Sequence, residues 1–259
     1  MEKSKRDFLK VSGLCALGLG VLPLAKGIAA GNAPQVMPNP EALKGQKWAM
    51  VVDMKKCWEK GKEGCKDCLD ACHKVHNVPT IEDPQEEIKW IWTEHYENTF
   101  PGLGNPYTNE KLKGKPFIVL CNHCSNPPCV RVCPTQATFK RADGITMMDY
   151  HRCIGCRFCM AGCPFGARSF NFREPREYIK DLNYKYPGRE RGVVEKCSFC
   201  DERLAVGQLP ACVESCKVGA LVFGDQTDPK SPVRKLLDTN FTIRRKTELG
   251  TEPNVYYII

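Results

Sequence analysis

The sequence predicts an α+β fold in which one small cysteine-rich module is inserted into another, with long loops and a C-terminal extension. Of the 17 cysteines, all but Cys15 fall into four groups of four, and short apolar segments separate the groups. The second and third groups lie together in residues 121–163, and the first and fourth flank them. The simplest chain path therefore nests the middle pair of groups within the outer pair.

The third cysteine group has the spacing of a bacterial iron–sulfur motif. Residues 153–163 read C-x2-C-x2-C-x3-C and Pro164 follows, while the second group also ends in C-x3-C, before Pro134. In proteins with two such runs, the fourth cysteine of each run ligates the neighbouring cluster. The four groups therefore predict two nested ferredoxin-like modules, each holding two [4Fe–4S] clusters.

Exchange of the fourth cysteine assigns ligands to four centres, which we number I to IV. The inner pair follows directly from the motif spacing, whereas the outer pair depends on Cys57, which is separated from the next cysteine by an unusual gap of seven residues. The predicted ligand sets are Cys57, Cys65, Cys68 and Cys216 for centre I, Cys72, Cys197, Cys200 and Cys212 for centre II, Cys121, Cys124, Cys129 and Cys163 for centre III, and Cys133, Cys153, Cys156 and Cys159 for centre IV.

Short apolar segments between the groups predict the secondary structure. An Asp143–Gly144 turn flanked by apolar residues is typical of a β-hairpin, and we expect it to join 137–140 to 145–149. Further strands are expected at 48–53, within 87–96, and at 117–120, 167–172, 220–223 and 255–259, with a helix at 231–237.

These segments define the predicted domain boundaries. The inner module spans 113–180, and the outer module combines 45–112 with 181–235. Residues 31–46 are rich in Pro, Gly and Asn and are predicted to be a linker. Residues 236–259 form the expected C-terminal tail.

Residues 1–30 are predicted to be a Tat-like signal peptide. A basic start precedes an apolar stretch with small-residue cleavage sites, and residues 4–10 resemble the twin-arginine motif except that Lys5 replaces the first arginine. Cys15 lies within the apolar stretch and is expected to be removed or inert. An uncleaved membrane anchor is the alternative interpretation. Beyond this leader, no segment of the sequence is apolar enough to span a bilayer.

The formal charge of +8 does not indicate nucleic-acid binding. Loss of the leader lowers the charge, and sixteen thiolates around four clusters contribute about −8 more, so the loaded protein is expected to be slightly acidic. Many of the lysines and arginines then offset cluster charge. We therefore expect no nucleic-acid partner.

Other cysteine chemistry and catalysis are less consistent with the sequence. Disulfides in an exported protein or structural zinc would leave the two C-x3-C-P endings to chance. No C-x-x-C-H haem-attachment motif accompanies the five histidines. Cubanes with four cysteine ligands have no open position, and no nucleophile–base or nucleotide-binding motif is present. We therefore predict an electron-transfer subunit with no catalytic residues.

Residues 121–135, 153–164 and 210–216 resemble the four-cluster subunits of the dimethyl sulfoxide reductase superfamily. The leader, residues 88–101 and residues 253–259 are similar to DsrO, the family of periplasmic iron–sulfur subunits in DsrMKJOP complexes of dissimilatory sulfur metabolism. That resemblance implies an NrfD-like integral membrane quinone-interacting subunit, a multihaem cytochrome c subunit, further membrane and cytoplasmic subunits, and menaquinone chemistry. The alternative is an electron-transfer subunit of an exported molybdopterin oxidoreductase of the polysulfide or thiosulfate reductase type.

Two features distinguish this chain within the superfamily pattern. Lys217 follows Cys216 and His73 follows Cys72, so the outer groups lack the proline ending. Because Cys156 is present where some relatives carry another residue and a three-iron cluster, we expect four cubanes. We also expect some of the basic residues in or beside the groups to raise local reduction potentials; these are Arg131, Arg152, Arg157, Lys196 and Lys217.

Overall fold

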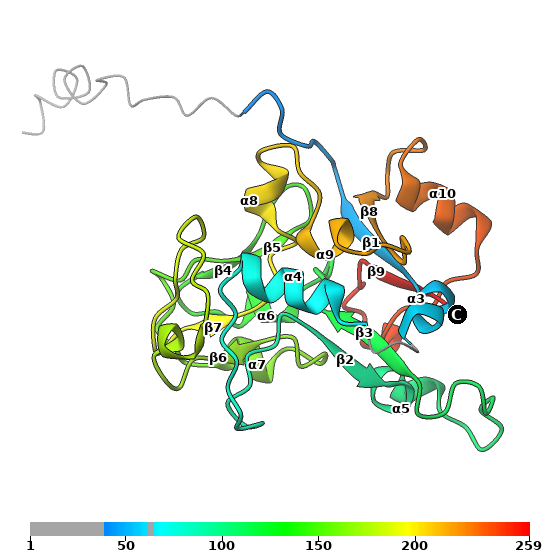
Figure 1. The fold of residues 1–259 in the computed structure, drawn as a ribbon, viewed down its shortest axis with the longest axis horizontal. Helices are drawn as coiled ribbons and strands as arrows, with labels where there is room; N and C mark the ends of the chain where they lie inside the picture. Colours follow the sequence, from blue (N-terminus) through cyan, green and yellow to red (C-terminus); the bar gives the residue numbers. More distant parts are fainter. Residues whose placement is uncertain (1–38, 62–64) are drawn as a thin grey trace, which may run out of the picture. The chain divides into compact units, whose positions relative to one another are not determined.

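The structure, a computed structural model, describes residues 39–61 and 65–259. The predicted signal peptide, Cys15 and the first part of the predicted linker lie outside the described residues. Residues 41–259 form one compact unit (Figure 1). Within the described residues, no helix is both long enough and apolar enough to cross a membrane.

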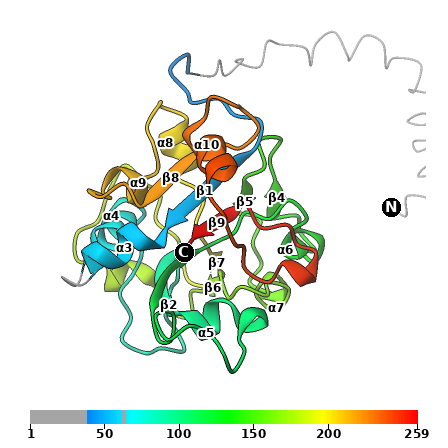
Figure 2. The ribbon, with the colours of Figure 1, turned by 90° about the vertical axis from the view of Figure 1, so that its right-hand side faces the viewer.

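A three-stranded sheet is built around β1 (Trp48–Asp53). β8 (Leu221–Asp225) pairs with it antiparallel, with Trp48 opposite Asp225, and β9 (Val255–Ile258) pairs with it parallel, with Met50 opposite Val255. All three strands were expected, but their pairing was not. Figure 2 shows β9, from the predicted C-terminal tail, beside β1.

Both faces of β1 are buried, which explains why its sequence is apolar throughout rather than alternating. Ala49 and Val51 pack against Val233 of α10 (Pro232–Thr239) on one face. Met50 and Val52 face the main core on the other. The helix expected at 231–237 is thereby confirmed, and it covers the outer face of the sheet.

The remaining strands form three small antiparallel pairs that hold the cysteine loops. The expected hairpin is confirmed, with Thr138 opposite Met148. The pairs are β2 (Ile91–His95) with β3 (Pro116–Leu120), β4 (Thr138–Lys140) with β5 (Thr146–Met148), and β6 (Ser169–Phe170) with β7 (Val194–Glu195).

Short helices carry many of the cysteines. Residues four apart lie on the same face of a helix, one turn from each other. The two cysteines of a C-x3-C pair on one helix therefore reach two sites that lie next to each other. The helices are α3 (Met54–Gly61), α4 (Asp67–Val75), α5 (Tyr96–Thr99), α6 (Pro128–Arg131), α7 (Phe158–Ala161), α8 (Asp201–Leu204) and α9 (Ala211–Glu214), with 3-10 turns at Pro101–Leu103, Pro175–Tyr178 and Thr247–Leu249.

An aromatic cluster joins residues 88–101 to the C-terminal tail. The Phe100 ring lies 5.2 Å from that of Phe117 and 5.4 Å from that of Tyr257, both edge to face. Phe100, Phe117 and Tyr257 are all buried. The two segments that carry the closer family resemblance therefore form part of one core.

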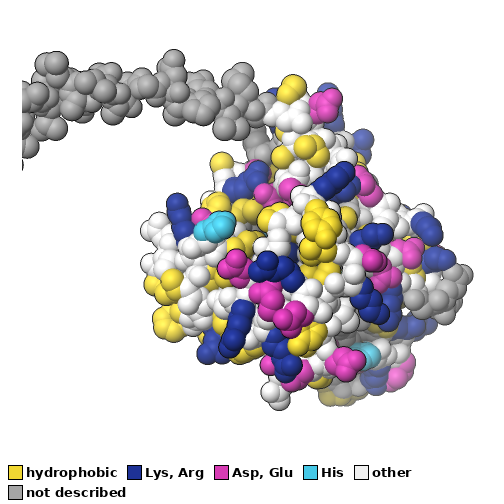
Figure 3. Space-filling model, turned by 60° about the vertical axis from the view of Figure 1, so that its left-hand side comes forward, with side chains coloured by type: hydrophobic (Ala, Val, Ile, Leu, Met, Phe, Trp, Pro, Cys, Tyr) yellow, Lys and Arg dark blue, Asp and Glu magenta, His cyan; other side chains and the backbone are white. Residues whose placement is uncertain are grey.

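The surface mixes charged and apolar groups. On the face shown in Figure 3, basic and acidic side chains lie among exposed hydrophobic ones. Two of the exposed apolar side chains belong to the third cysteine loop: Ile154 is 66% exposed and Phe158 is 61% exposed.

Candidate metal centres

The four predicted ligands of centre I line one cavity. Cys57 lies on α3, Cys68 on α4 and Cys216 just after α9, while the exposed Cys65 precedes α4. Apolar side chains from β1, β3 and β8 form the inner wall; these are Val52, Ile118 and Leu221. Burial, followed by Cys57, Cys216 and Cys65, raises the pKa of the Cys68 thiol to about 12.

The predicted ligands of centre II are all buried. Burial raises the pKa of Cys72 well above its usual value, and Cys197, Cys212 and Cys200 raise it further, so the four sulfurs lie close together. Backbone N–H groups also face these sulfurs. The N–H of Phe199 donates to Cys197 Sγ at 3.4 Å, and that of Ala211 donates to Cys200 Sγ at 3.4 Å.

The predicted ligands of centre III line a second cavity, which is lined also by Thr146 and Arg168. Cys121, Cys124 and Cys129 are buried, and Cys163 is partly buried. Burial raises the pKa of Cys124 to about 12, and Cys121 adds to the shift.

Three of the four predicted ligands of centre IV meet in an apolar cluster around Ala137 and Met148. These are Cys133, Cys153 and Cys159. The N–H of Thr138 faces Cys133 Sγ at 3.5 Å. Cys156, the fourth predicted ligand, is exposed in the loop that follows Gly155.

These donor sets fit cubane clusters. All sixteen cysteines among the described residues are free thiols rather than disulfides. Burial and neighbouring sulfurs raise the pKa values of Cys57, Cys68 and Cys72, among others, so four thiolates in one apolar site require a compensating positive charge. A [4Fe–4S]²⁺ core supplies that charge, and N–H groups aimed at the sulfurs stabilise it further.

The four centres follow one another in space in the order I, II, III, IV. Cys68 and Cys72 lie one turn apart on α4 and link centres I and II. Cys121 of centre III is the cysteine that most raises the pKa of Cys197 of centre II, after burial. Cys129 of centre III likewise raises the pKa of Cys159 of centre IV, where burial is again the largest cause.

An aromatic stack joins the loops of centres II and III. His123 lies between Cys121 and Cys124, and Phe199 lies between Cys197 and Cys200. The two rings are 3.7 Å apart with an interplanar angle of 15°. Both side chains are buried, so this stack fixes how closely the two loops approach.

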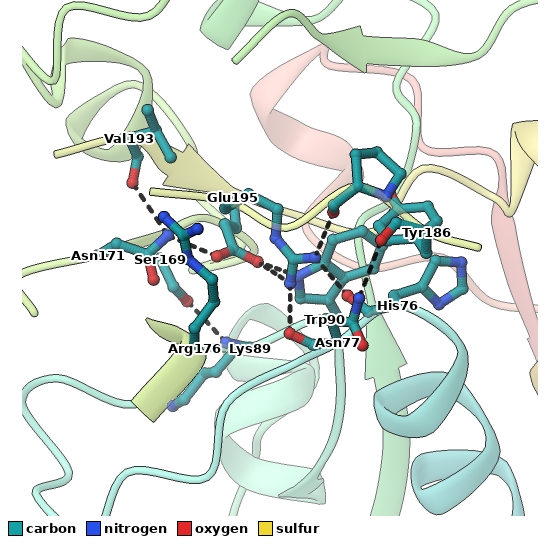
Figure 4. A network of polar contacts seen from close by, with 12 residues as sticks. His76, Asn77, Lys89, Trp90, Ser169, Asn171, Arg176, Tyr186, Val193 and Glu195 are labelled. Atoms are coloured by element: carbon teal, nitrogen blue, oxygen red, sulfur yellow. Dashed lines mark hydrogen bonds and ion pairs between the residues drawn. The ribbon is translucent and has the colours of Figure 1, made fainter. Parts of the chain in front are cut away.

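A buried polar network supports the strand that leads into the fourth cysteine group (Figure 4). Glu195 Oε2 accepts a hydrogen bond from Trp90 Nε1 at 2.9 Å and pairs with Arg189 Nη2 at 2.7 Å. Asn171 Nδ2 donates to the other carboxylate oxygen. The same guanidinium donates to the backbone oxygens of His76 and Asn77, which ties the chain after α4 to this strand.

The basic residues singled out from the sequence differ in their surroundings. Lys196 is 1% exposed, and the other four are exposed. Arg168, which the sequence analysis did not identify, is 5% exposed and lines the cavity of centre III. It lies outside the cysteine runs, and only its position shortly after Cys163 and Pro164 could have drawn attention to it.

Comparison with known proteins adds independent support. The 4Fe-4S dicluster domain family matches residues 115–177 and 171–226. The chain is 41% identical to the Hdr-like menaquinol oxidoreductase iron-sulfur subunit 1 of Archaeoglobus fulgidus, over 98% of this chain and 97% of that protein. It is 36% identical to a subunit of the selenate reductase of Mesobacillus selenatarsenatis, over 98% and 97%. It is 34% identical to protein NrfC of Escherichia coli, over 100% and 96%.

Proposed function

We propose that this chain connects two partner subunits of an electron-transfer complex. The chain belongs to the family of iron–sulfur subunits of NrfC-like and Hdr-like menaquinol oxidoreductases. It carries four [4Fe–4S] clusters and transfers electrons rather than transforming a substrate. In our proposal it relays electrons between an NrfD-like membrane quinone-interacting subunit and a multihaem cytochrome c, in a DsrMKJOP-type complex of dissimilatory sulfur metabolism.

The similarity to the Archaeoglobus subunit carries the proposal. That protein is described as part of a menaquinol oxidoreductase, and the match extends over almost the whole of both chains. Residues 88–101 and 253–259, which suggested the DsrO family, pack in one core through Phe100 and Tyr257. These two segments therefore support a fold shared with the DsrO family, whereas the full-length similarity supports a role shared with the Archaeoglobus subunit.

The residues of this chain support a relay with two ends. When bound, the clusters supply one-electron redox chemistry at the four cysteine sets. The buried cysteines of centre II keep water from the middle of the path, while Cys65 of centre I and Cys156 of centre IV are exposed at its ends. Two partners at opposite ends of such a path exchange electrons without touching each other.

We propose that the protein works on the extracytoplasmic side of the membrane. The Tat-like leader supports this location because that route exports proteins already folded around their cofactors. Membrane association then comes from partner subunits. Fusing residues 1–46 to a reporter tests the location: export that depends on the Tat translocase supports it, and retention in the cytoplasm contradicts it.

The second candidate is an electron-transfer subunit of an exported molybdopterin oxidoreductase. The nearly full-length similarity to a selenate reductase subunit favours it. In that case one end of the relay meets a molybdopterin subunit in place of a cytochrome, and the cysteine sets remain the same.

Purification of the native complex under anaerobic conditions separates the two candidates. The proposal predicts haem c and an NrfD-like subunit in the preparation, without molybdenum. Molybdenum in a stoichiometric amount, with no haem c, would support the second candidate. An antibody or affinity tag at the C-terminus is unsuitable because Val255 and Tyr257 are buried in the sheet.

A further inference from the structure

We infer that a buried cation, Arg168, holds the reduction potential of centre III above that of its neighbour, centre II. This inference rests on the proposed ligand sets and on the presence of the clusters. It concerns the relative reduction potentials of neighbouring centres, which the role as an electron relay alone does not specify.

Arg168 reaches centre III from the segment between the third cysteine group and β6. Its side chain lines the same cavity as the four predicted ligands of that centre. Nη1 donates to Thr138 Oγ1 at 3.1 Å, whereas the buried Nη2 has no hydrogen-bond partner among the described residues. Burial would lower the pKa of Arg168, but the nearby sulfurs of Cys129, Cys159 and Cys121 raise it, so the guanidinium stays charged.

Lys196 lies between centres II and III, and its charge partly offsets the rise that burial causes in the pKa of Cys197 of centre II. Its Nζ donates to the backbone oxygens of Cys197, at 2.6 Å, and of Thr146, which lines the cavity of centre III. The N–H of Thr146 in turn donates to His123 Nδ1 at 3.2 Å. Both cations also act on His123, whose pKa is lowered first by burial and then by Lys196 and Arg168.

Neither cation is neutralised by a carboxylate. Among the described residues, no carboxylate oxygen lies within 4.0 Å of the charged nitrogens of Arg168 or Lys196. Arg189 provides the contrast, because its buried guanidinium pairs with Glu195. Successive strand residues project to opposite faces, so Glu195 faces Arg189 while Lys196 faces the centres.

Acidic groups lie instead beside centre II. Glu202 raises the pKa values of Cys197 and Cys200, after burial and the neighbouring cysteines, although Lys196 opposes it at Cys197. Asp201 also lies near Lys196, but its carboxylate is 3.6 Å from Arg141. Reduction adds one negative charge to a cluster, so nearby cations favour it and nearby anions oppose it. Arg168 acts on the sulfurs of Cys129 and Cys121 of centre III, so it favours the electron on centre III relative to centre II, whereas Lys196 acts on both centres.

The test is a redox titration of the intact holoprotein with dithionite and mediators, followed by electron paramagnetic resonance. Arg168→Met should lower the equilibrium constant for reducing centre III about tenfold, or about 59 mV for a one-electron couple. Lys196→Met should lower the potentials of centres II and III together, so it should change the difference between them less than Arg168→Met does. Arg168→Lys should restore most of the shift, which a merely structural role would not predict.

Matched variants complete the experiment. Arg131→Met removes an exposed guanidinium two residues after Cys129 and should leave the potential of centre III unchanged. Cys124→Ser identifies the signal of centre III beforehand. An unchanged potential in Arg168→Met, or equal shifts in Arg131→Met, would overturn the inference while leaving the relay intact. A Cys124→Ser protein with four unchanged signals would overturn both the ligand set and the inference.

Discussion

The interior centres II and III and the terminal centres I and IV use the same ligand type in different surroundings. All four predicted ligands of centre II are buried, and centre III has three buried ligands. Each terminal centre instead exposes one cysteine, Cys65 or Cys156. The interior centres are therefore shielded from solvent and adjusted by fixed charges, while the terminal centres are accessible to partners.

The two terminal centres also differ from each other. The cavity of centre I includes the basic side chains of Lys60 and Lys217. The loop of centre IV exposes Ile154 and Phe158, and Arg157 lies over the rings of Phe170 and Phe172 at 5.3 and 5.6 Å. One end thus adds basic side chains to an apolar cavity and the other exposes apolar side chains, which suits contacts with two different partners.

Replacing one exposed and one buried cysteine should give the largest difference, which is measured as the iron that each variant retains. Cys156→Ala removes an exposed ligand and should leave a three-iron cluster, with about fifteen irons per chain. Cys200→Ala removes a buried ligand, so the site collapses and about twelve irons or fewer remain. Iron and acid-labile sulfide analysis measures both. Equal iron loss in the two variants would contradict the distinction.

Two phenylalanines at equivalent loop positions test the same contrast through packing. Phe199 precedes Cys200 and is 1% exposed, whereas Phe158 precedes Cys159 and is 61% exposed. Phe199→Ala should cost about 3–5 kcal/mol of the free energy of unfolding. Phe158→Ala should change it by no more than about 0.5 kcal/mol. Anaerobic denaturation of the two holoproteins measures the free energy of unfolding of each variant. Similar losses would show that the exposure of the ring does not determine its contribution to stability.

The buried ion pair between Arg189 and Glu195 provides a third test. Arg189→Leu leaves Glu195 charged without its partner, and such a change costs about 3–5 kcal/mol. The control is Arg234→Ala, which breaks an exposed pair with Asp238 and should cost about 0.5 kcal/mol or less. Thermal unfolding midpoints of the two variants measure the difference. A midpoint for Arg189→Leu as high as that of the control would refute the supporting role of the network.

The backbone at centre IV gives the smallest expected effect. Gly155 has φ +69°, and an added Cβ would lie 2.4 Å from the backbone oxygen of Gly192. Gly166 has φ +64° with open space around its Cα. Gly166→Ala should cost about 1–2 kcal/mol from backbone strain, and Gly155→Ala should cost more because a backbone atom must also move. Denaturation of the two variants in parallel measures their losses in the free energy of unfolding. A larger loss in Gly166→Ala than in Gly155→Ala would contradict this order.

Local patterns made much of this fold predictable. The cysteine spacing predicted the cofactor, and the dicluster family matches confirm it. The Asp143–Gly144 turn predicted the hairpin of β4 and β5 because turn chemistry is local. Helix α3 was missed because its segment contains Cys57 within the unusual first group, although Met54, Cys57 and Trp58 repeat at the spacing of a helix face.

Long-range features were not predictable from the same patterns. The parallel pairing of β9 with β1 brings together residues 50 and 255, and nothing local encodes that partner. Lys196 was identified from its position beside Cys197, but its burial depends on the hairpin that supplies the Thr146 oxygen. Arg168 was missed because its proximity to centre III arises only when the second and third cysteine groups fold together.

A density map of the anaerobically purified native complex, determined by electron cryo-microscopy, tests the central claim most directly. We expect four cubic densities in the order I to IV, each held by its proposed cysteine set, with an NrfD-like subunit and a haem-bearing subunit at different ends. A different order of centres, a cluster that lacks Cys57 at the first site, or both partners at one end would contradict it.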